Sequence, residues 1–373
     1  MPWDACDDCL RRSWLIARLA GHLELRRADR SAIREVLALT DLQLIDALAG
    51  RRRADLLRAW HDFDAAASRR SWRSTGAGAL CRHARRYPRA LLDLSDPPSV
   101  LYIQGAEDRL DELLGPDGAR GDVVAVVGAR KASPDGRDIA RALARGLSAV
   151  GVPVVSGMAL GIDGAAHEGA LAGGGRTVAV LACGPERAYP PSRTRLHAQL
   201  VERALVVAEL PPGTAPHRWA FPARNRIIAA LARMAVIVEA AERSGSLITA
   251  EIAMDLGREV GAVPGSPLAW RSTGANALLR DGAHPVRDVA DVLDDLFGIG
   301  HNRTESESQT AFAVDLEPEL GALLASIDGG RDTVDANAAT SEEVRQVLAR
   351  LTRLELLGLV ERRPGGHYVR ATR

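Results

Sequence analysis

Short apolar runs, each followed by an amphipathic stretch, recur through the middle of this 373-residue chain. Val123–Val127 contains only apolar residues, as expected for a parallel strand that is buried on both faces. Similar runs follow at Pro153–Val155, Thr177–Leu181, Leu205–Ala208, Ala235–Val238 and Glu259–Val263. Amphipathic helices fit between them at Asp135–Val150, Gly161–Ala172, Ser192–Glu202, Arg224–Leu231 and Ile248–Leu256. This alternation predicts an α/β fold: a Rossmann-like, doubly wound parallel sheet with helices on both faces.

The flanking regions predict further domains. Residues 1–115 are expected to form a helical N-terminal domain with a connector, with helix starts near Ser31 and Thr40 and a short strand at Val100–Ile103. Residues 116–297 make the Rossmann-like domain, and residues 298–313 form a polar, acidic linker. Residues 314–373 hold two or three helices followed by a hairpin around Pro364-Gly-Gly, which predicts a winged-helix domain.

The charge balance is consistent with a polyanion partner, although the formal net charge is zero. Residues 121–234 carry 14 basic against 8 acidic side chains, whereas residues 281–330 carry 2 against 11. This asymmetry suggests a polyanion-binding body and a solvated connector, and random surface variation is the alternative. The sequence has no apolar run of about 20 residues and no export signal at its start, so we expect a cytoplasmic protein without membrane insertion.

Three loops follow predicted strands and enter helices, which is where ligands bind in such sheets. In the first loop, Gly128 permits a tight turn, Arg130 and Lys131 supply charge, and Ser133 with Pro134 begins a helix. Such a helix N-terminus favours phosphate. The loop has Arg130 where a dinucleotide fingerprint needs glycine, and the chain has no Walker motif. We therefore expect a bound phosphate but neither NAD nor hydrolysable ATP, and no cofactor.

The second loop contains Ser156, Gly157 and Gly161 and leads into a helix with Asp163 and His167 one turn apart. That spacing permits a hydrogen bond between the two side chains. In a catalytic interpretation His167 is a general base that Asp163 orients. In the favoured alternative, Asp163 satisfies backbone donors and His167 is a packing residue. The sequence identifies no third catalytic partner.

The third loop adds the hydroxyl groups of Ser244 and Ser246 around Gly245. Before it, Arg224-Asn225-Arg226 stands near a predicted helix start, where two arginines suit bidentate contact with phosphate. Ion pairing at the protein surface is the alternative for these arginines. Aromatic residues make up only 4% of the chain, so extensive base stacking is not expected. The aromatic candidates in this domain are Tyr189, Trp219, Phe221 and Trp270, and for Trp219 and Phe221 core burial is an equal alternative.

The four cysteines predict no metal site. Cys6 and Cys9 form a C-x-x-C pair, which supplies two of the four ligands that a structural zinc needs. Cys81 and Cys183 are single and are expected elsewhere in the fold, with His22 as the nearest histidine.

The order of these motifs resembles the DNA-processing protein A (DprA/Smf) family. The resemblance rests on Gly128-Ala-Arg-x-x-Ser, Ser156-Gly-Met-Ala-Leu-Gly-Ile-Asp, Phe221-Pro-x-Arg-Asn-Arg-Ile-Ile, Ser244-Gly-Ser-Leu-Ile-Thr-Ala, Val263-Pro-Gly and Ser272-Thr-Gly-x-Asn. Tyr87-Pro and Asp96-Pro-Pro extend it, so that it covers most of residues 80–297.

The resemblance implies a homodimer that binds single-stranded DNA, displaces single-strand-binding protein and loads RecA recombinase onto the strand during natural transformation, without catalysis. It also implies a SAM-like N-terminal domain and a winged-helix C-terminal domain. The implied single-stranded-DNA or phosphate contacts are Gly128, Arg130, Lys131, Ser133, Ser156, Gly157, Gly161, Asp163, Arg224, Asn225, Arg226, Ser244, Gly245 and Ser246. Two alternatives remain: a nucleotide hydrolase that uses Asp163 or Glu239, and a duplex-DNA regulator that acts through residues 312–373.

Overall fold

The computed structural model describes residues 5–26, 30–105, 108–298, 318–328, 331–337, 340–356, 359–362 and 366–370. These residues fall into two compact units, residues 1–299 and residues 300–373. The expected linker at 298–313 lies almost wholly outside the described residues. Among the described residues, no helix is both long and apolar enough to cross a membrane.

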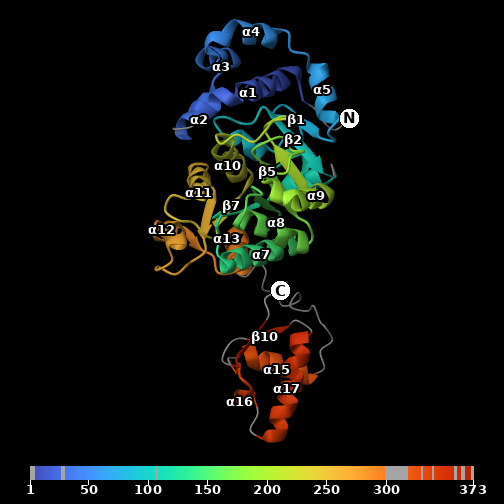
Figure 1. The fold of residues 1–373 in the computed structure, drawn as a ribbon, viewed down its shortest axis with the longest axis vertical. Coiled ribbons are helices and arrows are strands. Elements are labelled where there is room, and N and C mark those ends of the chain that lie inside the picture. Colours follow the sequence, from blue (N-terminus) through green and yellow to red (C-terminus); the bar gives the residue numbers. More distant parts are fainter. Residues whose placement is uncertain are drawn as a thin grey trace. The chain divides into compact units, whose positions relative to one another are not determined.

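A nine-stranded sheet forms the centre of the first unit, in the order β1-β2-β6-β5-β4-β3-β7-β8-β9. Figure 1 shows helices such as α8 and α10 beside this sheet. From β6 to β9 all neighbouring strands are parallel, whereas β1 and β2 pair antiparallel at one edge. The strands span Gly78–Cys81, Val100–Gly105, Val124–Val127, Val154–Ser156, Thr177–Leu181, Leu205–Ala208, Met234–Ile237, Glu259–Ala262 and His284–Pro285. The predicted doubly wound α/β fold is confirmed.

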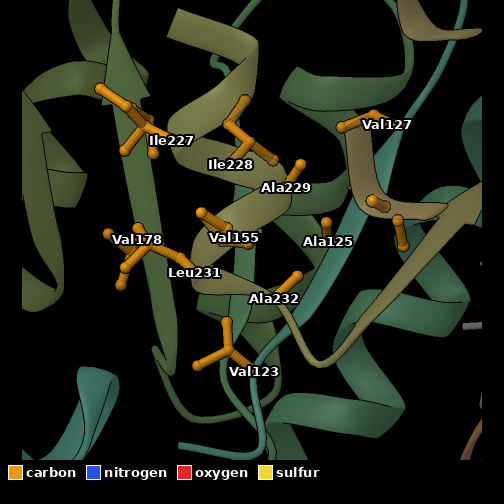
Figure 2. Packing of buried hydrophobic residues seen from close by; sticks show 14 of the residues in the cluster. Val123, Ala125, Val127, Val155, Val178, Ile227, Ile228, Ala229, Leu231 and Ala232 are labelled. Atoms are coloured by element: carbon orange, nitrogen blue, oxygen red, sulfur yellow. The ribbon is translucent and has the colours of Figure 1, made fainter. Parts of the chain in front are cut away.

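Helices cover both faces of this sheet because alternate residues of β3 point in opposite directions. Val123, Ala125 and Val127 pack in one cluster with α10 and α11, whereas Val124 and Val126 pack in another with α7, α8 and α13. Figure 2 shows α10 lying over β3, β4 and β5, with Ile227, Ile228 and Leu231 directed toward the sheet. The helices between β2 and the linker are α6 (Arg109–Leu114), α7 (Pro134–Ala149), α8 (Ile162–Ala172), α9 (Thr194–Arg203), α10 (Ala220–Leu231), α11 (Gly245–Asp255), α12 (Thr273–Arg280) and α13 (Val289–Phe297).

The chain changes winding direction at β3. From β3 it proceeds through β4 and β5 to β6 on one side, and it then returns to place β7 on the other side of β3. The loops that leave β3 and β7 therefore diverge from neighbouring strand ends, which opens a crevice between them. This topology places the first and third predicted loops in one place.

Helices α1 (Asp7–Arg26), α2 (Arg30–Ala38), α3 (Asp41–Leu48), α4 (Arg53–His61) and α5 (Ala65–Arg73) confirm the predicted helical N-terminal part. Thr40 begins α3 with a capping box completed by Gln43. Leu15, Leu19 and Ile45 form a core with Trp219 at the start of α10, so these helices pack against the sheet unit. Strands β1 and β2 belong to the large sheet, which therefore begins well before the expected boundary at residue 116.

One placement from the sequence was wrong. Cys81 was expected to lie apart from Cys6 and Cys9, but β1 pairs with β2 beneath the start of α1 and brings the three together. Cys9, Leu10 and Cys81 share a small core with Trp72 and Tyr102.

The second unit has the predicted order of helices followed by a hairpin. Its described helices are α15 (Pro318–Asp328), α16 (Val334–Asn337) and α17 (Ser341–Leu356), and strands β10 (Val360–Arg362) and β11 (Tyr368–Arg370) pair antiparallel. Leu323, Leu351 and Tyr368 are among the buried residues that hold it together.

Candidate nucleic-acid interface

A cleft of about 1060 Å³ opens at the point where the winding direction changes. It is lined by the loop after β3, the loop between β7 and α11, the first turns of α10, and the short 3₁₀ segment Trp270–Ser272. Nine of the 14 residues predicted from the sequence line it: Gly128, Arg130, Lys131, Asp163, Arg224, Asn225, Ser244, Gly245 and Ser246. The other five, Ser133, Ser156, Gly157, Gly161 and Arg226, do not line it.

The outer edge of the cleft is basic. Arg130, Lys131, Arg218 and Arg243 line it and are exposed, and Arg271 is half-buried beside them. We call these five residues the rim. With Arg224 the lining carries six basic side chains, and Asp163 is the one acidic side chain among its described residues. An anion that enters the cleft therefore meets a strongly positive field.

The floor of the cleft holds a buried arginine rather than an exposed cation. The Arg224 guanidinium donates to the carbonyl oxygens of Gly157, at 2.8 Å, and Val180. Burial lowers the pKa of Arg224 to about 10, and the nearby Asp163 carboxylate opposes that shift. Burial likewise raises the pKa of Asp163, with Arg224 opposing. Each charge compensates the other, so this arginine holds the loop after β4 in place.

Arg226 lies in the core, away from the cleft. Its Nε donates to Asp96 at 2.7 Å, and its other nitrogens donate to Glu209 at 2.8 and 2.9 Å, with 0% of the residue exposed. The predicted phosphate contact of Arg226 and its alternative, an ion pair at the protein surface, are therefore both wrong, because the ion pairs of Arg226 are buried. The Asp96-Pro-Pro motif of the sequence now has a structural role, because Asp96 joins the segment before β2 to α10.

The N-terminus of α7 carries its own anion. Glu239, at the end of the β7 strand region, accepts a hydrogen bond from the backbone N–H of Ser133 at 2.8 Å. The Ser133 side chain in turn accepts from the N–H of Gly136 at 2.9 Å. The expected free N–H groups of this helix start are therefore partly satisfied by the protein, and Ser133 is a capping residue.

Close backbone packing explains two of the glycines in these loops. A Cβ atom on Gly128 would lie 2.6 Å from Ile162 and 2.9 Å from the carbonyl oxygen of Glu239. Gly161 has a φ of +79°, and a Cβ there would lie 2.1 Å from the carbonyl oxygen of Ala129. These glycines bring the loops after β3, β4 and β7 together, and Ser156 fastens its strand end by donating to the carbonyl of Val126 at 2.7 Å.

The loop after β7 begins α11 with a serine cap. The Ser244 hydroxyl accepts from the N–H of Ser246 at 3.4 Å, and the two hydroxyl groups are 2.7 Å apart. Asn225 of α10 donates to the carbonyl of Gly245 at 3.2 Å, which ties this helix start to α10. The exposed Gly245 leaves the backbone at this helix start accessible from the cleft.

Aromatic side chains stand among the rim cations. Trp270 is 61% exposed, and the Arg271 guanidinium lies 4.6 Å from its ring centroid. Arg130 lies 5.0 Å from the centroid of Phe221, which in turn packs at 5.4 Å against Tyr189, a residue 38% exposed. Trp219 is 1% exposed and belongs to the core, the alternative left open from the sequence.

His167 is a packing residue. It is fully buried, and its Nδ1 lies 2.8 Å from the Thr177 hydroxyl, which donates to the carbonyl of Val154. Because that hydroxyl donates its own proton elsewhere, it accepts one from His167 Nδ1. Burial lowers the pKa of His167 to about 3, so the ring is neutral.

Sequence reasoning missed Arg218, Arg243 and Arg271 as members of the cleft. Arg243 directly precedes Ser244, and Arg271 directly follows Trp270. Their positions next to predicted site residues were the available signal for these two arginines.

These features define a class: doubly wound α/β proteins with a basic cleft at the switch point of the sheet. Within that class, the chain belongs to the DNA recombination-mediator protein A family, whose model matches residues 78–297. A Mycobacterium tuberculosis protein that carries the DprA name is 38% identical over 368 residues, which cover 98% of this chain and 86% of that protein.

Two solved structures extend the comparison. The X-ray structure of DNA processing protein A from Streptococcus pneumoniae has a TM-score of 0.62 and 33% identity, and the match covers 78% of this chain and 99% of that one. DNA processing protein A from Helicobacter pylori, whose structure was described for its single-stranded DNA binding mode, has a TM-score of 0.52 and 29% identity over 59% of this chain and 95% of that one.

Proposed function

We propose that this chain is a cytoplasmic protein that binds single-stranded DNA without sequence preference and passes it to RecA recombinase. The observation that carries the proposal is the basic cleft: six cationic side chains and one buried acidic side chain line the crevice at the switch point. A sugar–phosphate chain is the polyanion that this arrangement suits. Its successive phosphates can contact cations that are spread along the whole cleft, whereas a single phosphate is too small to reach all of them.

The exposed rim supports binding through phosphates. Arg130, Lys131, Arg218 and Arg243 are free to turn toward a flexible strand, and they would contact its backbone rather than its base edges. Such contacts release counterions, so the affinity should fall steeply as salt rises, with a logarithmic slope of about −0.7 for each phosphate contacted.

The aromatic residues on the rim support a strand with unpaired bases. Trp270 offers an exposed ring beside Arg271, and Tyr189 offers an exposed edge beside Phe221. Every base has a flat face, so stacking on such rings adds affinity for single strands and not for sequence. We propose one or two stacked bases, fewer than in a protein that relies on stacking.

We propose binding without catalysis because the groups named for acid–base chemistry have structural roles. Glu239 holds the start of α7, Asp163 is buried near Arg224 and accepts backbone hydrogen bonds, and His167 is buried and neutral. The rival hydrolase would have to release one of these groups from its present partner.

The proposed partners rest on the family. A recombination mediator transfers DNA to a recombinase, so RecA is the proposed recipient and single-strand-binding protein the competitor to be displaced. We also propose a homodimer, as the sequence resemblance implies.

The direct test is the binding of fluorescent oligothymidine to the full chain at several salt concentrations. We expect salt-sensitive binding, similar affinity for a mixed-sequence strand, and no turnover of nucleotides in parallel assays. Arg243→Ala should weaken binding about tenfold, as expected for the loss of one charged contact. Arg287→Ala is the matched control, because Arg287 is exposed but pairs with Asp291 outside the cleft.

Three results would contradict the proposal. Nucleotide hydrolysis with negligible oligonucleotide affinity would favour the rival enzyme. Loss of all DNA binding on deletion of residues 312–373, with preference for duplex DNA, would favour the regulator. If Arg243→Ala and Arg287→Ala changed DNA affinity equally, the cleft would not be the DNA-binding site.

A further inference from the structure

Four potential metal ligands converge where the N-terminal helices meet the sheet. The sulfur atoms of Cys6, Cys9 and Cys81 and a ring nitrogen of His83 all lie within 4.8 Å of one another. The Nδ1 atom of His83 is 3.4 Å from the Cys6 sulfur and 3.6 Å from the Cys9 sulfur. Sequence reasoning recognised only the Cys6/Cys9 pair and did not consider His83.

The local structure of each segment explains the convergence. Cys6 precedes α1 and accepts the N–H of Leu10 on its carbonyl oxygen, so Cys9 lies in the first helical turn. Cys81 ends β1, and His83 follows in the turn that leaves that strand. The Cys6 N–H points at the Cys81 sulfur, 3.5 Å away. This donor, with the positive end of the α1 dipole, stabilises negative charge on sulfur.

The distances match a tetrahedral site of the size that zinc requires. Zinc–sulfur and zinc–nitrogen bonds of about 2.3 and 2.0 Å place a sulfur and a nitrogen ligand about 3.5 Å apart at the tetrahedral angle. The observed sulfur–nitrogen distances of 3.4 and 3.6 Å lie on either side of that value. Three sulfur ligands favour zinc over harder divalent cations.

We propose that Cys6, Cys9, Cys81 and His83 bind a structural zinc ion. All four coordination positions are filled by the protein, as in structural rather than catalytic zinc sites. Cys9 and Cys81 are buried, whereas His83 is exposed and closes the site from the solvent side.

The ion would join α1 to β1. Nearby, the Tyr102 hydroxyl of β2 donates to Ser13 of α1 at 3.1 Å, and the small core of Leu10, Trp72 and Ala79 packs α1 against β1. Zinc would add four bonds between segments 75 residues apart. None of the four ligands lines the DNA cleft, so the ion should stabilise the N-terminal part without contacting DNA.

The test measures metal content of the full chain, purified without chelators or a histidine tag from cells grown with added zinc. Mass spectrometry of the metal should give about one zinc ion per chain. Reconstitution with Co²⁺ should give the thiolate charge-transfer and visible bands of a tetrahedral sulfur-rich site. Removing the ion with a thiol-blocking mercurial and a chelator should lower the melting temperature.

Variants separate the proposed ligands from other thiols. The Cys9→Ser, Cys81→Ser double variant should lose zinc, and His83→Ala should hold it more weakly, whereas His83→Cys should retain it. Cys183→Ser is the matched control, because Cys183 is also buried but hydrogen-bonds to the Arg187 carbonyl in another core.

The wild-type cobalt spectrum and metal content do not depend on whether any variant folds. A wild-type chain that carries no zinc and gives no cobalt charge-transfer band would overturn the proposal. A disulfide among Cys6, Cys9 and Cys81 in freshly purified protein, or equal metal loss in Cys183→Ser, would overturn it as well.

Discussion

The rim of the cleft and the buried interior next to it, which comprises the floor and the core, both carry arginine, but the two sets of arginines face different surroundings. Arg224 and Arg226 are buried: one terminal nitrogen of Arg224 donates to two carbonyl oxygens, and Arg226 donates to the carboxylates of Asp96 and Glu209. Arg130 and Arg243 are exposed at the edge of the same cleft. A buried, paired arginine maintains the fold, whereas an exposed one is available to a ligand. Substitutions of the buried arginines should therefore change the free energy of unfolding, and substitutions of the rim arginines should change the affinity for DNA.

The largest effect is expected for Arg226→Ala. Its loss leaves Asp96 and Glu209 buried without a cation, which should lower the free energy of unfolding by about 3–5 kcal/mol. Urea unfolding measures this change. Arg130→Ala is the control and should alter stability by no more than about 0.5 kcal/mol. If the Arg226→Ala protein had normal stability but had lost its affinity for DNA, the structural role assigned to Arg226 would be wrong.

The rim should respond most strongly to the double change Arg130→Ala, Arg243→Ala. Loss of two charged contacts should weaken oligothymidine binding by at least about 100-fold, at about 1.5–3 kcal/mol for each contact. The salt slope should become shallower by about 1.4 if each arginine holds one phosphate. Fluorescence anisotropy at four salt concentrations measures both quantities. An unchanged slope would mean that these arginines do not contact phosphates.

Trp270→Ala tests whether the rim also contacts bases. Removal of the exposed ring should cost about 1–3 kcal/mol of binding free energy if one base stacks on it. Because the charge is unchanged, the salt slope should stay the same. Trp270→Phe should recover part of the affinity. If Trp270→Ala bound DNA with full affinity, no base would stack on Trp270.

A smaller effect is expected from pH at His167, behind the floor. Its pKa is about 3 in the folded protein against 6.5 in an ordinary histidine, so below pH 6.5 the unfolded chain binds a proton that the folded chain does not. Stability should therefore fall as the pH falls, by about 1.5 kcal/mol between pH 6.5 and 5 from this group. Urea unfolding of wild type and His167→Asn at both pH values measures it, and the variant should show the smaller loss.

Sequence reasoning located the site better than it assigned the individual residues. The apolar runs predicted a doubly wound parallel sheet with three loops at its strand ends, and nine of the predicted residues do meet in one cleft. The pattern could not distinguish Arg226 from Arg130, because burial depends on carboxylates at positions 96 and 209 that come close only in the folded chain. The prediction that both arginines of Arg224-Asn225-Arg226 contact phosphate was based on their residue type and their place near a helix start, neither of which shows burial.

The N-terminal part shows the same difficulty with long-range contacts. Cys6 and Cys9 are adjacent in a familiar spacing, but their neighbours Cys81 and His83 are more than 70 residues away and meet them only through β1. Strand β1 was not predicted, so its cysteine could not be placed. The sequence did contain one signal: Cys81 and His83 are two residues apart and form a second pair of potential metal ligands.

Glu239 has a consequence for which anions this protein can prefer. Its carboxylate is tethered at the start of α7, so a small soluble phosphate would have to displace a competitor that never diffuses away. A long strand that lies along the rim need not enter that position at all. Under the proposed function, this glutamate would favour the binding of polymers over that of mononucleotides.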